Sequence, residues 1–256
     1  MSHPQRLPLS AVIITRNAAS SLPDCLKALA FCDEILVVDS GSTDQTVALA
    51  VEHGAKIVHQ DWLGFGAQKQ FAATQAAHDW VLCVDADERV SETLKESILR
   101  ALAQPHCLAY RFPRRNRFLG RYLHHGEGYP DWSLRLFDRR HARWSTDTVH
   151  EKVLTQTQIG SLNGDLLHDS AESLSTYLDK QNRYTTLAAQ QAHAAGERSH
   201  VGHLVLSPLL RFLKLYFLRL GFLDGVPGLA HILIGCGNSF VKHAKIIELQ
   251  SRSSPT

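Results

Sequence analysis

Two apolar stretches of this sequence end abruptly in carboxylates. Residues 35–39 read ILVVD, and residues 80–88 read WVLCVDADE. Runs of this kind are typical of strands buried on both faces of a parallel sheet, and the carboxyl ends of such strands line the ligand crevice. Asp85 and Asp87 offer oxygen ligands that suit a hard divalent cation, which can also bridge to phosphates. The pattern therefore predicts a site for a cation and a phosphorylated ligand.

The composition limits the possible classes of protein. The chain has 256 residues, 44% of them apolar, which is enough for one large domain or a domain with an appendage. A formal net charge of +2 is too small to indicate binding to a polyanion, so no nucleic-acid partner is expected. Five cysteines without a CxxC pair predict reduced thiols and no disulfide framework. Residues 1–8 are polar, so we expect no signal peptide.

Predicted strands and helices alternate over the first 104 residues. Strands are expected at residues 9–15, 35–39, 56–59 and 80–85, with helices that open near residues 21, 42, 67 and 91. Ser21 and Ser91 are expected to cap their helices, and Ser42 with Gln45 to form a capping box. The strict alternation implies right-handed crossovers and a parallel, doubly wound sheet.

The alternation of predicted strands and helices ends after Cys107. Strands are predicted at residues 110–112 and 133–137, with a long loop between them that is rich in arginine, histidine, glycine and aromatic residues. A long ordered loop in a compact domain is often functional. Residues 174–195 have the periodicity of an amphipathic helix.

Three motifs occur in order at the predicted strand ends: Thr15-Arg16-Asn17, Asp39-Ser40-Gly41-Ser42-Thr43-Asp44 and Asp85-Ala86-Asp87-Glu88. In these motifs the chain resembles the inverting family 2 glycosyltransferases of GT-A fold. Six further segments resemble the bacterial lipopolysaccharide core β-glucosyltransferase subgroup (WaaE/KdtX type): residues 64–69, 79–82, 135–137, 149–151, 221–225 and 240–242. The resemblance covers residues 9–249.

The resemblance implies an α/β fold of the GT-A type, a Rossmann-like nucleotide-diphospho-sugar transferase with a parallel-rich sheet and a C-terminal helical membrane-associating extension. We expect a catalytic domain at residues 9–200, between an N-terminal tail at 1–8 and an apolar extension at 201–249, with a tail at 250–256. The catalytic domain is expected to comprise a donor half at 9–106, an acceptor half at 107–170 and a helix at 171–200.

The resemblance also implies a UDP-sugar donor and a divalent metal, Mg or Mn. Asp39 matches the residue that accepts a hydrogen bond from uracil. Asp85 matches the acid near the ribose, and Asp87 the metal ligand, with Asp85 and His168 as further candidate ligands. The other donor-binding candidates are Thr15, Arg16, Asn17, Ser42 and Lys69. Three alternatives stay open: Lys69 as a solvated surface lysine, Asp44 as a helix N-terminal residue, and His168 as a structural histidine.

An inverting transfer also needs a general base that deprotonates the acceptor hydroxyl during attack on the anomeric carbon. The resemblance places Glu151 in this position, and Asp131 is the competing candidate. His150 either orients Glu151 or is an ordinary strand histidine.

The acceptor is expected to be lipid-linked or a lipopolysaccharide core. Arg114, Arg115 and Arg117 suit its phosphates, because arginine makes bidentate phosphate contacts. Trp132 suits stacking on a sugar. A solvated loop and a core aromatic residue are the respective structural alternatives.

Residues 204–220 are unusually apolar and carry three cations, Arg211, Lys214 and Arg219. At about 100° per residue these cations share one arc, and Leu209, Phe212, Leu213, Tyr216 and Leu220 cover the opposite side. This pattern indicates an interfacial helix and a monotopic protein on the cytoplasmic face of the inner membrane. The alternative is a pair of helices packed onto the catalytic domain or a dimer partner.

Two other functions remain as alternatives from the sequence. A nucleotidyltransferase of related fold needs a glycine-rich phosphate loop after the first strand, and residues 15–19 lack glycine. A non-catalytic module that binds a sugar nucleotide or a lipid would not need the metal and base candidates Asp87 and Glu151. Replacing Asp87 with alanine would distinguish these functions. Loss of metal-dependent turnover would support the glycosyltransferase, and unchanged ligand binding and function would support the non-catalytic module.

Overall fold

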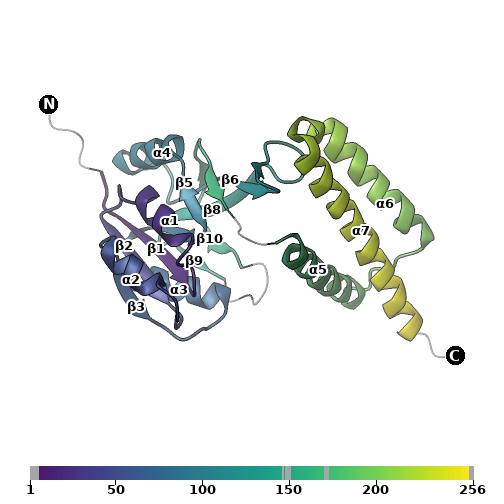
Figure 1. Cartoon of the computed structure of the whole chain (residues 1–256), viewed down its shortest axis with the longest axis horizontal. Coiled ribbons are helices and arrows are strands. Elements are labelled where there is room, and N and C mark those ends of the chain that lie inside the picture. The colour runs from purple at the N-terminus through teal and green to yellow at the C-terminus, as the bar shows by residue number, and fades with distance from the viewer. Residues whose placement is uncertain (1–5, 146, 148–150, 170–172, 254–256) are drawn as a thin grey trace. The chain divides into compact units, whose positions relative to one another are not determined.

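The computed structural model describes residues 6–145, 147, 151–169 and 173–253. Its contacts divide the chain into two compact units. Residues 1–114 and 131–169 form the first, here called the sheet unit, and residues 115–130 and 170–256 form the second, here called the helical unit (Figure 1). This division differs from the predicted boundaries, because residues 115–130 and the helix predicted at 171–200 belong with the C-terminal segment.

The first four strands of the sheet unit are parallel, as the alternating pattern predicted. They are β1 (Leu9–Thr15), β2 (Glu34–Asp39), β3 (Lys56–His59) and β4 (Trp80–Asp85), in the order β3-β2-β1-β4. The connecting helices are α1 (Leu22–Ala28), α2 (Thr46–Glu52) and α3 (Phe65–Gln75). The carboxyl ends of β1, β2 and β4, which carry the predicted motifs, therefore lie at one edge of the sheet.

The sheet continues beyond β4 with strands of mixed direction. Along this part lie β8 (Asp131–Asp138), β6 (Ala109–Phe118), β12 (Leu166–His168) and β5 (Glu88–Val90), and β11 (Ile159–Ser161) pairs with β6. A separate pair is formed by β9 (Ala142–Trp144) and β10 (Val153–Thr155). The loop predicted after residue 112 is wrong in its first part, because β6 runs on to Phe118 by pairing with β8 and with β7 (Arg121–Tyr122).

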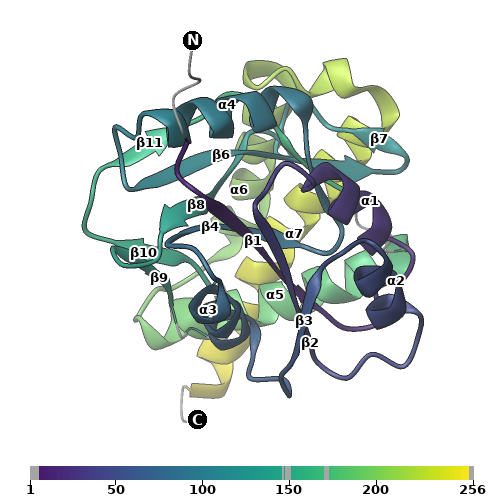
Figure 2. The same ribbon diagram turned by 90° about the vertical axis from the view of Figure 1, so that its left-hand side faces the viewer.

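Both faces of the sheet are covered, so its central strands are buried on both sides (Figure 2). One core cluster joins Leu22 and Leu26 of α1 to residues of α4 (Glu92–Ala103), including Leu94 and Ile98. The other face packs against α3 and β9, through Ala72, Ala73 and Trp144. Side chains alternate along β1: Ala11 and Ile13 belong to the first cluster and Val12 to the second.

Of the predicted helix caps, only that of Ser91 is confirmed: its hydroxyl accepts the N–H of Leu94. Ser21 makes no cap hydrogen bond and instead donates its hydroxyl to the carbonyl of Ala18. The Ser42–Gln45 capping box is also wrong, because α2 begins later and the Ser42 hydroxyl bonds Asp39. Asp44 takes the structural role, accepting the N–H of Thr46 at 3.0 Å.

The helical unit contains three long helices, α5 (Leu174–Ala194), α6 (Val201–Leu213) and α7 (Gly225–Ser253). α7 packs against both of the others (Figure 1). A π-helical turn, η1 (Lys214–Leu218), extends α6, and a 3-10 turn, η2 (Gly221–Asp224), leads into α7. α7 extends to Ser253, and its later turns pack against α5 through Ile246 and Leu249.

Candidate active site

A buried lysine links two carboxylates at the end of β4. Lys69 Nζ lies 3.2 Å from Asp85 Oδ1 and 3.0 Å from Glu151 Oε1, and only 7% of the lysine side chain is exposed. Lys69 is therefore not a solvated surface residue. Its position depends on close packing of α3, since a Cβ added to Gly66 would lie 2.2 Å from the carbonyl oxygen of Ser145. Asp85, a donor-binding candidate, and Glu151, the base candidate, are thus both paired with Lys69.

Arg135 of β8 approaches Asp85 from the other side. Its Nη2 lies 3.0 Å from Asp85 and 3.3 Å from Glu88, and its guanidinium stacks over the ring of Trp144 at 5.4 Å. Burial alone would raise the pKa of Asp85, but Arg135 and Lys69 hold that pKa well below its usual range. Asp85 is therefore ionised throughout the physiological pH range.

Glu88 supports the turn that follows β4. Its side chain is fully buried; Oε2 accepts the backbone N–H of Asp85 at 2.9 Å, and Oε1 lies within 3.4 Å of both Arg114 and Arg135. A buried carboxylate held by two arginines fixes the path of the chain from Asp85 to Asp87.

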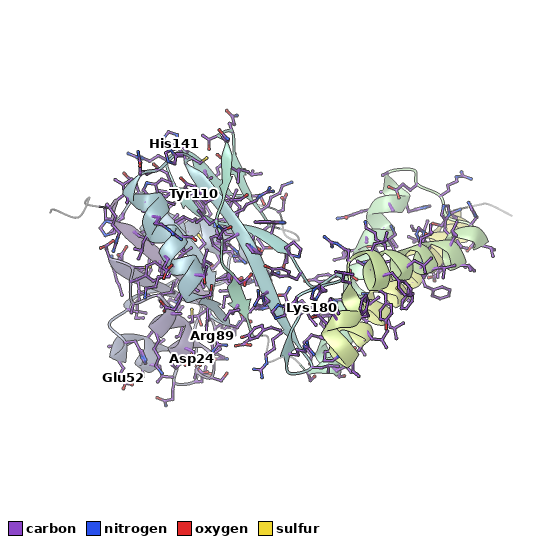
Figure 3. The ribbon with its side chains drawn as sticks, turned by 90° about the horizontal axis from the view of Figure 1, so that it is seen from above. Asp24, Glu52, Arg89, Tyr110, His141 and Lys180 are labelled. Carbon is purple, nitrogen blue, oxygen red and sulfur yellow. The ribbon has the colours of Figure 1, made fainter. Side chains whose placement is uncertain are left out.

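Asp87 and His168 lie together beside this cluster, with Asp87 Oδ2 3.3 Å from His168 Nε2. The antiparallel ladder between β12 and β5 pairs His168 with Glu88, and the N–H of Asp169 donates to the carbonyl of Asp87 at 2.9 Å. Arg89 reinforces the ladder by pairing with Asp169 and with Asp24, which lies beside it in Figure 3. Burial opposes protonation of His168, but the hydrogen bond to Asp87 raises its pKa above the usual value.

A divalent cation fits this pair better than the predicted set of three ligands. Among the described residues no three His, Cys, Asp or Glu side chains are grouped so as to hold a metal, and Asp85 is paired with Lys69 and Arg135. Asp87 and His168 supply one oxygen and one nitrogen ligand from partly exposed side chains. Ions of this class are often held by one or two protein ligands together with phosphate oxygens of a substrate.

The loops that follow β1 and β2 are joined around Asp39. Its Oδ2 accepts the N–H groups of Gly41 and Ser42 at 2.9 Å, and its Oδ1 accepts the Ser42 hydroxyl. The same hydroxyl accepts the N–H of Asn17 at 2.8 Å, with Asn17 in the left-handed region at φ 52°. Arg16 is exposed beside Asn17. The structure thus brings together these donor-binding candidates, and Oδ1 of Asp39 keeps capacity for a further donor.

Comparison with known proteins decides the family of this chain. A model of the family described as glycosyl transferase family 2 matches residues 10–158. The chain belongs to this family. Over 252 residues it is 34% identical to the lipopolysaccharide core biosynthesis glycosyltransferase LpsC of Rhizobium meliloti (strain 1021), covering 95% of this chain and 93% of that protein.

Other relatives of this family 2 glycosyltransferase are more distant. It is 30% identical over 258 residues to an uncharacterized glycosyltransferase, RT0209, of Rickettsia typhi, covering 96% of this chain and 88% of that protein. Among solved structures it is similar to S. aureus TarS 1-349, with a TM-score of 0.49 and 14% identity over 96% of this chain and 91% of that chain. The predicted resemblance and GT-A fold class are confirmed by the family match.

The predicted acceptor residues of this family 2 glycosyltransferase lie on two paired strands, the three arginines on β6 and Trp132 on β8. Arg114 is bound to Asp131, with Nη2 2.7 Å from Oδ2, and to Glu88. Trp132 is exposed and stacks with Arg111 at 5.0 Å. Arg115 and Arg117 belong to the helical unit, where Arg115 stacks on Tyr129 at 5.1 Å.

The two base candidates differ in their surroundings. Asp131 is held by two nitrogens of Arg114, whereas Glu151 has Lys69 beside it. His150, the predicted orienting residue, lies outside the described residues. Thr15 is buried at the end of β1, and its hydroxyl has no hydrogen-bond partner among the described residues.

Sequence reasoning missed the role of Arg135. It occurred in a segment used only to recognise the subgroup, yet it is the most buried cation of the site together with Lys69. One signal was available: an arginine flanked by Leu134 and Leu136 in an apolar strand is rare unless a carboxylate pairs with it.

Proposed function

We propose that this glycosyltransferase transfers a hexose from a UDP-sugar to a lipopolysaccharide core or a similar membrane-associated glycan, with inversion at the anomeric carbon. The proposed hexose is glucose. The observation that carries the proposal is the Lys69 bridge between Asp85 and Glu151, next to the Asp87–His168 pair. The name of the relative LpsC supports a lipopolysaccharide core acceptor. We place the enzyme on the cytoplasmic face of the inner membrane, where five free thiols stay reduced.

The charge of the site supports a requirement for a divalent metal, Mg or Mn. Five carboxylates lie there with three cationic side chains, so the site carries surplus negative charge: Asp85, Asp87, Glu88, Asp131 and Glu151 against Lys69, Arg114 and Arg135. A diphosphate would be repelled unless a cation joined it to the carboxylates. Asp87 and His168 would hold the metal, which when bound supplies Lewis-acid neutralisation of the leaving diphosphate.

The residues of the chain divide the remaining work. Asp39 accepts the imide N–H of uracil through the free capacity of Oδ1. Lys69 keeps a positive charge beside Asp85, which favours the negatively charged donor. Glu151 accepts the proton of the acceptor hydroxyl. The hydroxyl oxygen forms the new bond to the anomeric carbon, and the bond from that carbon to UDP breaks on the opposite face. Asp131 is the weaker candidate, because Arg114 occupies its carboxylate.

Titration of UDP into the purified protein, with and without Mn²⁺, tests the donor site. We expect binding that depends on the metal and falls at least tenfold in Asp87→Ala. Asp61→Ala is the matched control, since 94% of that side chain is exposed, and it should bind as the unaltered protein does. Absence of UDP binding under every condition would contradict the proposed donor.

A further inference from the structure

The outer surface of α6 is apolar along its whole length. Its large side chains Val205, Leu206, Leu209, Leu210, Leu213 and Phe217 are each at least 43% exposed, and we call this group the α6 apolar surface. Leu218 follows with 81% exposed. An exposed patch of this kind on a soluble protein usually marks an interaction site.

The opposite face of the same segment makes the contact with α7. Phe212, Leu215 and Tyr216 pack there against Ile232 and Cys236. Phe212 and Tyr216, predicted to lie on the face turned to the membrane, therefore pack against α7 instead. The segment is packed on one face and exposed on the other.

The width of the α6 apolar surface distinguishes between possible partners. At about 100° per residue, its members within α6 span an arc of roughly 140°. The seam between two paired helices is narrower, because it consists mainly of every third and fourth residue. A second copy of the chain would therefore leave part of the surface exposed, whereas a lipid surface can cover the whole arc.

The charged side chains that residues 201–223 themselves contribute are all basic or histidine. No acidic residue occurs in residues 201–223, and Lys214 and Arg219 are exposed. Arg211, the third predicted cation, instead pairs with Glu127. Asp224, the first acid after this stretch, is buried and accepts the N–H groups of His124 and His125. The apolar surface with its exposed cations is complementary to anionic lipid headgroups.

The helix is unsuited to crossing the bilayer. Within the described residues one segment, Val201–Leu218, is long and apolar enough to do so by length and composition alone, with a mean hydropathy of 1.4. One face of it, however, packs against α7, which carries Lys242, Lys245 and Glu248. A spanning segment would place the Arg211–Glu127 pair in hydrocarbon, at a large cost in free energy.

We propose that the α6 apolar surface docks onto an anionic membrane surface, with the axis of α6 in the membrane plane and Lys214 and Arg219 at the level of the headgroups. The inference deepens the proposed function, on which it rests for the membrane-associated acceptor, by naming the surface that meets the membrane. The expected position is that of an interfacial amphipathic helix.

Flotation with vesicles, in the absence of any sugar nucleotide, tests the proposal. The full chain should float with vesicles of phosphatidylcholine and phosphatidylglycerol, and less with phosphatidylcholine alone. The double variant Leu206→Glu, Leu210→Glu should bind the anionic vesicles at least tenfold more weakly. Val51→Glu is the matched control, because Val51 is 60% exposed in α2 of the sheet unit, and it should bind normally.

A second variant tests the charge component. Lys214→Ala should weaken binding to anionic vesicles about fivefold, the effect of one lysine near an anionic surface, and leave binding to neutral vesicles unchanged. Three results would overturn the proposal: no binding to either vesicle, equal binding by the double variant, or a dimer that the double variant dissociates while vesicle binding is absent. UDP titration needs no vesicles, so failure here is distinguishable from failure of the catalytic proposal.

Discussion

Arg135 reaches along the sheet to Asp85, with Nη2 3.0 Å from the carboxylate. β4 and β8 are antiparallel neighbours in which Leu82 pairs with Leu136, so the arginine side chain extends past its own register position toward the end of β4. Its position depends on two strands from different halves of the sheet unit. The pair therefore joins the donor-side carboxylate to the antiparallel part of the sheet.

Removal of the Arg135 guanidinium should cost both stability and activity. Arg135→Ala removes one of the two cationic partners of both Asp85 and Glu88, and breaking a buried pair typically costs about 3–5 kcal/mol. Urea unfolding should show this loss, and glycosyl transfer should fall with it. Arg252→Ala is the control, because Arg252 is 72% exposed, and its effect should stay within about 0.5 kcal/mol. An unfolding midpoint equal to that of the control would show that the ion pair does not stabilise the fold.

The role of Glu151 can be tested without changing its shape. Glu151→Gln keeps the contact to Lys69 possible but cannot accept the acceptor proton, so we expect turnover to fall about 10²–10⁴-fold while UDP binding persists. Asp131→Asn should reduce turnover much less. The reverse order of the two variants would move the role of general base to Asp131.

The stability of the protein should depend on Asp138 at low pH. Burial would raise the pKa of this carboxyl, but hydrogen bonds from Arg140 lower it below the usual value. A lowered pKa in the folded state adds stability above the unfolded pKa of about 4, and this stability is lost as pH falls through the folded value.

Urea midpoints measured between pH 7 and pH 3 check this expectation. The urea midpoint should decrease less between pH 7 and pH 3 in Asp138→Asn than in the unaltered protein. Asp61→Asn serves as the exposed control and should leave the pH profile unchanged. Identical profiles for all three proteins would rule out a contribution from Asp138.

Close packing at Gly66 should be sensitive to one methyl group. Gly66→Ala would place a Cβ 2.2 Å from the carbonyl oxygen of Ser145, so α3 or the chain leading to Glu151 must move. Thermal unfolding should show a lower Tm, together with reduced turnover. Gly237→Ala has open space around the new atom and lies within α7, so it should stabilise by about 0.5–1 kcal/mol. A Gly66→Ala protein as stable and active as the unaltered chain would contradict this account.

Much of the sheet unit was predictable because its signals are local. Buried runs such as residues 9–15 and 80–85 needed only apolar composition and flanking turn residues, and both are confirmed as strands. The role of Arg135 was not predictable in the same way, since its partner Asp85 is 50 positions away along the chain. Nor does sequence reveal that Glu88 is buried, because its partners Arg114 and Arg135 come from other strands.

The C-terminal segment shows a different limit of prediction from sequence, which concerns the faces of a helix. A regular step of 100° per residue assigns faces correctly only where the helix is regular, and the π-helical turn at Lys214–Leu218 breaks that step. Leu209 and Leu213 precede the turn and are exposed as predicted, whereas Tyr216 lies within it and faces α7. Phe212 also faces α7 although it precedes the turn, because it lies at the edge of the apolar arc next to the packed face.

The π-helical turn also works as a spacer of one residue. A π turn contains one residue more than an α turn, so every position after it is rotated by about 100° relative to an uninterrupted α-helix. The segment ends directly after this turn, at Leu220 in the left-handed region at φ 55°, and the 3-10 turn then leads to Asp224, whose carboxylate accepts the N–H groups of His124 and His125. One inserted residue thus sets the direction in which the chain leaves α6 before Asp224 ties it to residues 124–125.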